Sequence, residues 1–262
     1  MGSANVFETA NAMADAAREA VLPFFRTADL ATDNKASDGF DPVTEGDRAA
    51  ERAMRQVLAR MRPDDGILGE EYGTQEGTSG LTWVLDPIDG TRAFLAGTPT
   101  WGVLIALSDK TGPVFGIIDQ PFIGERFEGG LGRAHVTGPM GQRPLKARGN
   151  RPLSESILFT TFPEVGDASE RSAFHTVAET VRLTRYGMDC YAYALLAAGQ
   201  IDLVIEAGLA AYDIQAPIAV IEAAGGIVTN WQGGPVHEGG RVVAAASHEQ
   251  HDAALEILSR AP

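Results

Sequence analysis

The chain has 262 residues, 44% of them hydrophobic, which is enough for one large domain or two closely packed halves with a substantial core. Its 35 acidic residues outnumber 21 basic residues and give a formal net charge of −14. So acidic a surface repels nucleic acid and anionic membranes, and we expect neither as a partner. The one cysteine, Cys190, excludes an internal disulfide and a cysteine-rich zinc site, and it fits a reducing compartment.

The first element is predicted to be helical. Residues 1–26 carry apolar side chains near helical spacing, and Glu8, Asp15 and Arg18 interrupt them, which is typical of an amphipathic helix rather than a signal peptide. No apolar run reaches the length of a membrane span. These features together predict a cytoplasmic protein.

The rest of the chain mixes strands and helices. The polar residues 28–41 predict a loop, and the loop-rich residues 134–151 predict the boundary between two closely packed halves of a single domain, about 1–145 and 146–262. Strands are expected at 67–70, 81–85, 102–107, 114–118, 157–161, 201–206, 227–230 and 241–245. Further helices are expected at 47–61, 171–182, 190–198, 214–224 and 249–259. Strands and helices in both halves predict layered α/β or α+β packing.

Two carboxylates follow an apolar run in the stretch 83–91, Trp-Val-Leu-Asp-Pro-Ile-Asp-Gly-Thr. Pro87 stiffens the backbone between Asp86 and Asp89, and Gly90 permits a sharp turn, so both carboxylates can converge near the Ile88 carbonyl. Hard oxygen ligands of this kind suit Mg²⁺. The local alternative is an exposed turn rich in aspartate and glycine.

Other acidic residues stand at the ends of predicted elements. Glu70 follows a short apolar strand, where two adjacent glutamates are ordinarily solvated. Asp47 follows Thr44 at capping-box spacing, and Asp213 opens a helix where an N-cap is expected. Each has a purely structural interpretation when it is considered alone.

In their order along the chain, these segments resemble the inositol monophosphatase family of metal-dependent phosphatases. The matching segments are Asp-Pro-Val-Thr-Glu-Gly-Asp at 41–47, Gly-Glu-Glu at 69–71, the stretch 83–91, Tyr-Asp at 212–213 and Glu-Ala-Ala-Gly-Gly at 222–226. The resemblance implies a layered α/β/α/β/α sandwich of the inositol monophosphatase and fructose-1,6-bisphosphatase type. It also implies a homodimer and a phosphomonoesterase that uses two or three Mg²⁺ ions, with Mn²⁺ as a substitute.

The resemblance also assigns roles to residues. It implies metal ligation by Glu70, Asp86, the Ile88 carbonyl, Asp89 and Asp213. Glu70, Asp47 and Thr91 form the implied catalytic set, in which Asp47 and Thr91 orient and deprotonate the attacking water. Backbone N–H groups of Gly90 and Thr91 would hold phosphate oxygens. The chain departs from the family pattern at Tyr212, where tryptophan is common, and at Ala93, where asparagine is frequent, and neither is an implied ligand.

Within the family, residues 185–199 and 201–206 look like those of the histidinol-phosphate phosphatases. The resemblance therefore predicts hydrolysis of L-histidinol phosphate to L-histidinol and phosphate, a step of histidine biosynthesis. Asp189, Glu206 and Arg185 are the candidates for contacting the substrate or supporting its site, because carboxylates complement an ammonium and an imidazole. Their structural alternatives are a helix N-cap for Asp189, a surface ion pair for Glu206 and a surface salt bridge for Arg185.

Three other functions compete with this prediction. Hydrolysis of inositol-1-phosphate or of sugar phosphates would use the same metal centre, and Glu206 also matches a polyol-contacting position. A haloacid-dehalogenase-type phosphatase needs Asp-x-Asp, whereas two residues separate Asp86 from Asp89. A regulatory module that binds metal without catalysis is disfavoured because all the implied catalytic residues are present.

Overall fold

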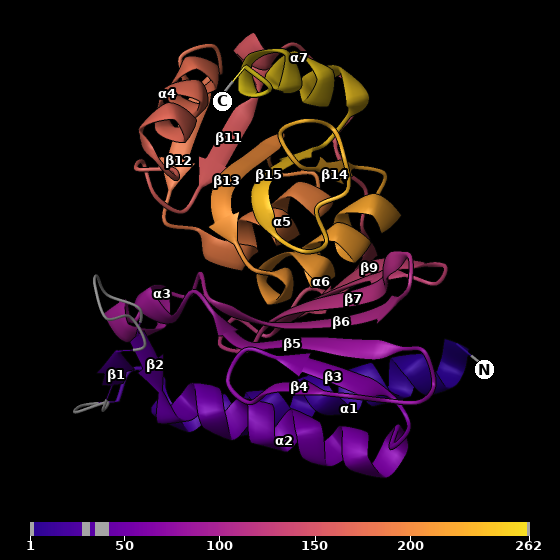
Figure 1. Cartoon of the computed structure of the whole chain (residues 1–262). Helices are drawn as coiled ribbons and strands as arrows, with labels where there is room; N and C mark the ends of the chain where they lie inside the picture. The colour runs from indigo at the N-terminus through magenta and orange to yellow at the C-terminus, as the bar shows by residue number, and fades with distance from the viewer. Residues whose placement is uncertain (1–2, 28–31, 35–41, 261–262) are drawn as a thin grey trace.

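The structure is a computed structural model that describes residues 3–27, 32–34 and 42–260. Its elements form two halves, stacked one above the other, and each half contains one large sheet (Figure 1). The predicted loop at 28–41 lies mostly outside the described residues, although Thr32–Asn34 within it forms a short strand. The division of a single domain at about residue 145 stays a prediction.

The first half holds an eight-stranded sheet and the N-terminal helices. The strand order is β10-β9-β8-β7-β6-β5-β3-β4, and all pairs are antiparallel except β3 with β5. The strands are β3 (Gly66–Gly69), β4 (Gly73–Gln75), β5 (Thr82–Asp89), β6 (Gly102–Asp109), β7 (Gly112–Gln120), β8 (Glu125–Gly130), β9 (Arg133–Gly138) and β10 (Gly141–Pro144). The remaining elements are α1 (Ser3–Val21), a short 3-10 turn (Leu22–Phe24), α2 (Glu45–Met61), α3 (Thr91–Ala96) and the small pair β1 (Thr32–Asn34) and β2 (Pro42–Thr44).

The second half holds a five-stranded mixed sheet in the order β12-β11-β13-β15-β14. Its strands are β11 (Ile157–Thr160), β12 (Leu183–Tyr186), β13 (Leu203–Leu209), β14 (Ile227–Thr229) and β15 (Gly240–Ala245). Its helices are α4 (Ala168–Ala178), α5 (Asp189–Ala197), α6 (Ala211–Ala223) and α7 (His248–Leu258), with a 3-10 turn at Leu153–Glu155.

These elements form five layers, which confirms the α/β/α/β/α sandwich predicted from the sequence. Helices α1 and α2 cover the outer face of the large sheet, α5 and α6 lie between the two sheets, and α4 and α7 cover the outer face of the small sheet (Figure 1). None of the described helices is long and apolar enough to span a membrane.

Both faces of the central strands are buried, which explains their continuous apolar runs. On β6, Val103, Ile105 and Leu107 pack toward α1 and α2, while Leu104 and Ala106 pack toward the middle helices. Alternate side chains of a strand point to opposite faces, so a strand covered on both sides needs apolar residues at every position.

The sequence analysis missed several strands, among them β8, β9, β10 and β12, and it extended one helix too far. The predicted loop at 134–151 contains the edge hairpin β9–β10, and β8 was not predicted at all. The helix expected at 171–182 ends at Ala178, and β12 follows it as an exposed edge strand. Edge strands face solvent along much of their length, so their sequences lack the apolar pattern that identified the central strands.

Helix α6 lies very close to the large sheet because glycine faces it. A Cβ atom at Gly116 would lie 2.5 Å from the carbonyl oxygen of Ala216, and one at Gly129 would lie 2.3 Å from Cα of Val220. Both distances are shorter than any van der Waals contact, so only glycine permits this approach. The position of α6 therefore depends on these two glycines.

We predict that Gly129→Ala displaces α6 and destabilises the fold. Overpacking of this kind lowers the free energy of unfolding by about 1–3 kcal/mol, which corresponds to a Tm decrease of roughly 2–12 °C. Thermal unfolding followed by circular dichroism measures the change. Gly149→Ala is the matched control, because a Cβ atom there would meet nothing within 4 Å, and it should leave Tm unchanged. Equal Tm values for the two variants would contradict this account of the α6 contact.

Candidate active site

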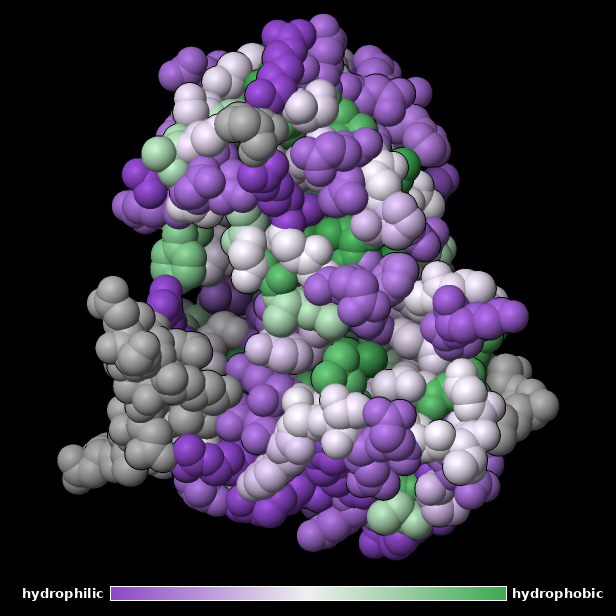
Figure 2. Space-filling model, viewed as in Figure 1, coloured by the Kyte–Doolittle hydropathy of each residue, from purple (hydrophilic) through white to green (hydrophobic). Residues whose placement is uncertain are grey.

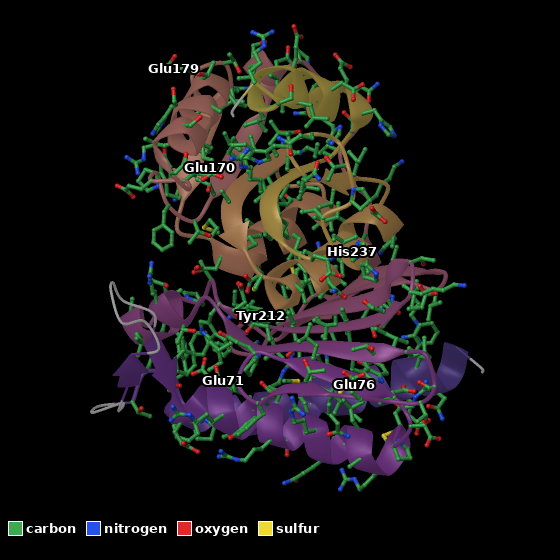
Figure 3. All side chains as sticks on the ribbon, in the orientation of Figure 1. Glu71, Glu76, Glu170, Glu179, Tyr212 and His237 are labelled. Carbon is green, nitrogen blue, oxygen red and sulfur yellow. The ribbon has the colours of Figure 1, made fainter. Side chains whose placement is uncertain are left out.

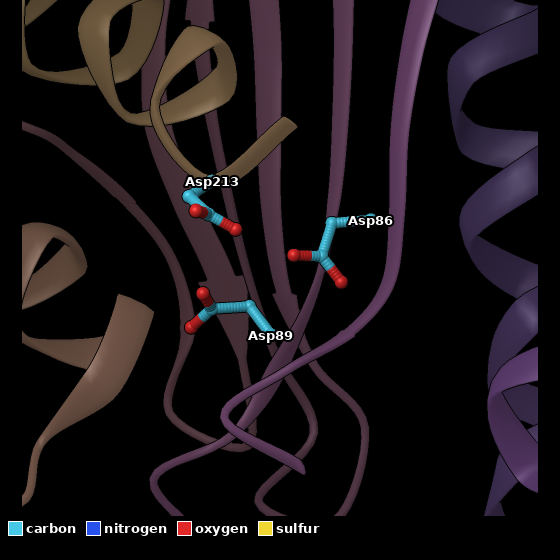
Figure 4. A group of neighbouring side chains, drawn as sticks. All are labelled: Asp86, Asp89 and Asp213. Atoms are coloured by element: carbon cyan, nitrogen blue, oxygen red, sulfur yellow. The ribbon is translucent and has the colours of Figure 1, made fainter. Parts of the chain in front are cut away.

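Three carboxylates converge where the two halves meet. Asp86 and Asp89 come from β5, and Asp213 comes from the first turn of α6 (Figure 4). One oxygen of each carboxylate lies within 4.8 Å of the others. The predicted convergence of Asp86 and Asp89 is present, and the fold adds Asp213 from 124 residues further along the chain.

A β-bulge brings the two β5 carboxylates together. Asp86 pairs with Leu104 and Asp89 pairs with Gly102, so three steps along β5 correspond to two steps along β6. In a regular strand, residues three apart point to opposite faces. The extra residue in β5 reverses that alternation and directs both side chains to the same site.

Glu70 reaches the same site from the neighbouring strand. It follows β3, which runs parallel to β5, and its backbone N–H donates to the Leu85 carbonyl at 3.2 Å. The carboxyl ends of parallel neighbours meet at one sheet edge, which places the Glu70 side chain against Asp86. Burial and the negative charge of Glu70 raise the pKa of Asp86 well above its usual range, with further contributions from Asp89 and Asp213.

The same electrostatics act on Asp89. Desolvation and the nearby charges of Asp213 and Asp189 raise the pKa of Asp89 well above its usual range. The Cys190 backbone N–H opposes this shift by donating to Asp89 Oδ2 at 2.6 Å. Crowded carboxylates of this kind need positive charge, and an all-oxygen donor set fits a hard divalent cation such as Mg²⁺. The residues therefore fit the metal that the sequence predicted.

Gly90 and Thr91 lie directly after the β5 carboxylates. Gly90 has φ +84°, and a Cβ atom there would lie 2.8 Å from Cγ of Asp189. The Thr91 hydroxyl lies 3.1 Å from the Ile88 carbonyl oxygen and 3.4 Å from Oδ1 of Asp47. The structure thus brings these residues to the carboxylate site, and phosphate binding by Gly90 and Thr91 stays a prediction.

Asp47 caps α2 and also faces the site, so its interpretation as a capping residue is compatible with its implied catalytic role. Its Oδ2 accepts from the Thr44 N–H at 2.8 Å and from the Thr44 hydroxyl at 2.6 Å, which forms the predicted capping box. Its other oxygen faces Thr91. Burial raises the pKa of Asp47 to about 6, the charge of Glu71 adds to the rise, and the Thr44 hydrogen bonds oppose it.

Sequence analysis missed Glu51, which holds the segment that carries Glu70. The fully buried Glu51 carboxylate accepts from the N–H groups of Glu71 at 2.7 Å and Tyr72 at 3.2 Å. Glu71 lies in the first half, near the large sheet (Figure 3). Glu51 follows Asp47 by four residues, one helical turn on the same face of α2, and that spacing was the available signal.

A cavity of about 270 Å³ extends from the carboxylates into the second half. On the side of α3, the space-filling view shows the surface indented between the two halves (Figure 2). The cavity is lined by Asp89, Thr160, Thr161, Phe162, Glu164, Val165, Gly166, Asp189, Cys190, Tyr193, Glu206, Ala207, Gly208, Leu209 and Asp213. Two of the predicted substrate residues, Asp189 and Glu206, are therefore part of its wall.

Glu206 is a buried cavity residue and not a partner in a surface ion pair. The Thr161 N–H donates to it at 3.0 Å, the Thr161 hydroxyl at 2.6 Å and the Tyr193 hydroxyl at 3.1 Å. Burial raises the pKa of Glu206 to about 7 against these hydrogen bonds. Its negative charge is thus fully developed only above neutral pH.

Asp189 is the first residue of α5 and has the unusual φ of +45°, so it is not the N-cap, which is Met188. The Thr100 hydroxyl from the first half donates to Asp189 Oδ2 at 3.1 Å. Burial raises the pKa of Asp189 to about 6, opposed by the Thr100 hydrogen bond and the positive charge of Arg92. No signal in the sequence connects Thr100 with Asp189, because 88 residues lie between them.

Arg185 and Asp213 differ from their expected placement. Arg185 is exposed on the edge strand β12 and is not among the residues that line the cavity, so its role stays a prediction. Asp213 is the third residue of α6 and not its N-cap, and it accepts from the Ala210 N–H at 2.6 Å. The neighbouring Tyr212 lies between the two halves (Figure 3).

Comparison with known proteins identifies the class to which this fold and site belong. A layered fold with an acidic centre at the junction of two sheets is that of the metal-dependent phosphatases. A solved inositol monophosphatase from Zymomonas mobilis superposes with a TM-score of 0.87 at 38% identity, and the match covers 99% of both chains. The bifunctional phosphatase IMPL2 of Arabidopsis thaliana is 40% identical over 95% of this chain and 73% of its own length. A histidinol-phosphatase of Mycobacterium tuberculosis is 36% identical over 95% of both chains.

The profile of the Inositol monophosphatase family matches residues 3–261. The chain therefore belongs to the inositol monophosphatase family, and it is a phosphoric monoester hydrolase. This confirms the family and the enzyme class that the sequence motifs indicated.

We predict that Asp86→Asn stabilises the metal-free protein at pH 8. The raised pKa of Asp86 means that the folded state binds its proton more tightly than the unfolded state does. Ionisation of Asp86 therefore lowers the free energy of unfolding as the pH rises above the ordinary pKa of a carboxyl group. The neutral side chain of asparagine does not ionise, so the variant avoids this loss. Thermal unfolding in EDTA should give a higher Tm for Asp86→Asn than for the wild type, and the difference should shrink toward pH 4.

Addition of Mg²⁺ should reverse this order. At about 100 times its Kd, a bound ion adds about 2.7 kcal/mol of stability, and Asp86→Asn should gain much less than the wild type. A lower Tm for the variant in EDTA at pH 8, or equal stabilisation of both proteins by Mg²⁺, would contradict a carboxylate cluster that requires a cation.

Proposed function

We propose that this phosphatase hydrolyses L-histidinol phosphate to L-histidinol and phosphate, in a Mg²⁺-dependent reaction within histidine biosynthesis. The observation that carries the proposal is the composition of the cavity wall. Beyond the metal centre it presents Asp189, Glu206 and Glu164, and none of the described residues in the wall is basic. Such a wall favours a leaving alcohol that carries positive charge.

The similarity to a histidinol-phosphatase over 95% of both chains supports the same substrate. Inositol-1-phosphate or a broader range of sugar phosphates is the second candidate, because the Zymomonas mobilis protein of the same fold is an inositol monophosphatase. Hydroxyls of a polyol could also donate to Glu206. The charge of the wall favours the cationic substrate, since a neutral polyol gains less from several carboxylates.

The metal ligands proposed for this chain are Glu70, Asp86, Asp89, Asp213 and the Ile88 carbonyl. Bound there, two or three Mg²⁺ ions, or Mn²⁺ in their place, would supply the positive charge that offsets the phosphate and makes water more acidic. The carboxylates repel one another without it, so the site is prepared for cations before the substrate arrives.

Thr91 and Asp47 are proposed to remove the proton from the attacking water. The Thr91 hydroxyl can accept that proton while it passes its own to Oδ1 of Asp47, which lies 3.4 Å away. A pKa of about 6 suits Asp47 for accepting a proton near neutral pH. Thr44 holds the other oxygen of Asp47, so the carboxylate keeps its orientation during the transfer. Gly90 and Thr91 N–H groups are proposed to hold the phosphate.

We predict that Thr91→Ala lowers kcat by about 10²-fold or more, the range expected when a positioned proton acceptor is lost. Thr91→Ser keeps the hydroxyl and should retain most of the activity. Initial rates of phosphate release at saturating substrate measure both variants, with thermal unfolding as the check that each is folded. Adding Asp47→Asn to Thr91→Ala should cause little further loss, because the two residues act as a unit. Multiplicative losses would show separate roles.

We predict that Asp189→Asn lowers kcat/KM for histidinol phosphate by roughly ten- to a hundredfold, the value of one charge-assisted hydrogen bond. Asparagine tolerates a positive φ, so the substitution preserves the backbone while it removes the charge. Hydrolysis of inositol-1-phosphate should change little. Phosphate release from histidinol phosphate, inositol-1-phosphate and fructose-1,6-bisphosphate, measured side by side with Mg²⁺, gives both the preference of the wild type and the effect of the variant.

A wild-type preference for inositol-1-phosphate would refute the proposed substrate and leave the metal centre untouched. An equal loss on both substrates would make Asp189 a structural residue. The homodimer, the cytoplasmic location and the absence of nucleic-acid and membrane partners stay predictions from the sequence.

A further inference from the structure

One wall of the cavity is a short segment between β11 and α4, residues 160–166. Both of its ends are held in place. At the start, the Thr161 N–H and hydroxyl donate to Glu206. At the end, Val165 is buried, and Asp167 and Glu170 form a capping box at the start of α4. The segment therefore presents its central residues at a defined position.

Phe162 is the aromatic residue of this segment, and it is exposed although it lines the cavity. Its relative exposure of 44% is high for a phenylalanine in a wall of a cavity. The sequence analysis did not single it out, and neither the metal centre nor the hydrolysis of the phosphate requires it. An apolar ring left open in the wall of a cavity is a surface available to a ligand.

Arg92 of the first half contacts this ring, although it is not among the residues that line the cavity. The central carbon of its guanidinium lies 5.0 Å from the centroid of the Phe162 ring, within the range of a cation–π contact. Arg92 belongs to α3 in the first half and follows Thr91 directly, whereas Phe162 belongs to the second half. The contact thus joins the two halves close to the reacting phosphate.

The charge of Arg92 also acts on Asp189, whose pKa it lowers. Arg92 therefore interacts with both Phe162 and Asp189, and these two residues line the same cavity. Because Phe162 lines the same cavity as Asp189 and the carboxylates, we expect a substrate whose phosphate is at the metal centre and whose cation faces Asp189 to bring the rest of its alcohol within reach of Phe162.

We propose that Phe162 is a specificity residue that stacks against a planar aromatic ring in the leaving alcohol, and that Arg92 is the positioning residue that holds it. This inference rests on the proposed function and adds to it the group that distinguishes a heteroaromatic alcohol from a polyol. The carboxylates select positive charge, whereas Phe162 selects a flat π surface. An imidazole offers both properties to the same cavity.

The test uses a matched pair of substrates, benzyl phosphate and cyclohexylmethyl phosphate, which differ in the aromaticity of one ring. Phe162→Leu keeps an apolar side chain and removes the π surface. It should lower kcat/KM for benzyl phosphate and for histidinol phosphate by about two- to tenfold, the fold-change that corresponds to one aromatic pair. The value for cyclohexylmethyl phosphate should change by less than about twofold. The loss should appear mainly in KM, because stacking on the alcohol acts before the phosphate reacts.

Two controls accompany this measurement. Phe162→Tyr keeps the ring and should give the wild-type ratio of the kcat/KM values for the two substrates. Inhibition by inorganic phosphate should be the same in the Phe162 variants, since phosphate is proposed to bind at the metal centre and to Gly90 and Thr91, and not to Phe162. If Phe162→Leu lowers kcat/KM equally for the aromatic and the saturated ester, or lowers neither, Phe162 is not a specificity residue.

The failure of this inference is distinguishable from the failure of the proposed function. If the wild type prefers inositol-1-phosphate to histidinol phosphate, the proposed substrate is wrong. The ratio of kcat/KM for benzyl phosphate to kcat/KM for cyclohexylmethyl phosphate still reports whether Phe162 stacks. If histidinol phosphate is preferred and that ratio is unaffected by Phe162→Leu, the substrate stands and the role of Phe162 is wrong.

Arg92 is tested through its dependence on Phe162. Arg92→Gln should raise KM for benzyl phosphate in the wild-type background and have no additional effect in the Phe162→Leu background. Arg92→Lys retains the cation and should recover part of the loss. Multiplicative effects of Arg92→Gln and Phe162→Leu would show that Arg92 acts elsewhere, for instance on the phosphate, and would overturn its assignment as the positioning residue.

Discussion

The mutual repulsion of carboxylates at the junction of the two sheets is the constraint on which the rest of the site depends. Asp86 and Asp89 come from β5 and Asp213 comes from α6, and their oxygens lie within 4.8 Å of one another. Burial and like charge raise the pKa of Asp86 and of Asp89. The folded chain therefore contains an unfavourable interaction that a divalent cation would relieve, and a bound cation would couple the stability of the fold to the proposed chemistry.

Holding these charges together requires the two halves to be fixed against each other, and several contacts do so near the site. Helix α6 approaches the large sheet through glycines, which leaves little freedom for Asp213. The Cys190 N–H of the second half donates to Asp89 of the first, and the Thr100 hydroxyl of the first half donates to Asp189 of the second. The site is consequently a property of the interface and not of either half alone.

The two halves contribute different kinds of selectivity. The first half supplies Asp47, Glu70 and Thr91, whose proposed roles concern the metal, the water and the phosphate that all phosphate monoesters share. The second half supplies most of the cavity wall, including Glu206 and the segment that carries Phe162. Changes in the cavity wall could therefore alter the substrate without altering the carboxylate centre, and two relatives of this chain are named for different phosphate esters.

The amino-acid sequence by itself determined the family and pointed to the acidic centre. Asp86 and Asp89 follow an apolar run, and this pattern suggested that they converge, whereas Glu70 and Asp213 were indicated only by the order of the motifs that resemble the family. The central strands could be predicted because buried strands need apolar residues, and the layered fold followed from the resemblance. The edge strands β10 and β12 and the strand β9 beside β10 could not be predicted, because they face solvent along much of their length and their sequences lack the apolar pattern of buried strands.

Only the tertiary structure decided which residues form the substrate cavity. Thr161 and Phe162 line the cavity, and Thr100 holds Asp189 in its wall, yet none of the three has a local pattern that marks it, since each contacts a partner far away in the sequence. Arg185 matched a local pattern, yet the fold leaves it exposed outside the cavity wall. Candidate Mg²⁺ ligands can be recognised by residue type, because few side chains bind this ion. A cavity wall is made of common residues, whose function comes from their proximity in the folded chain.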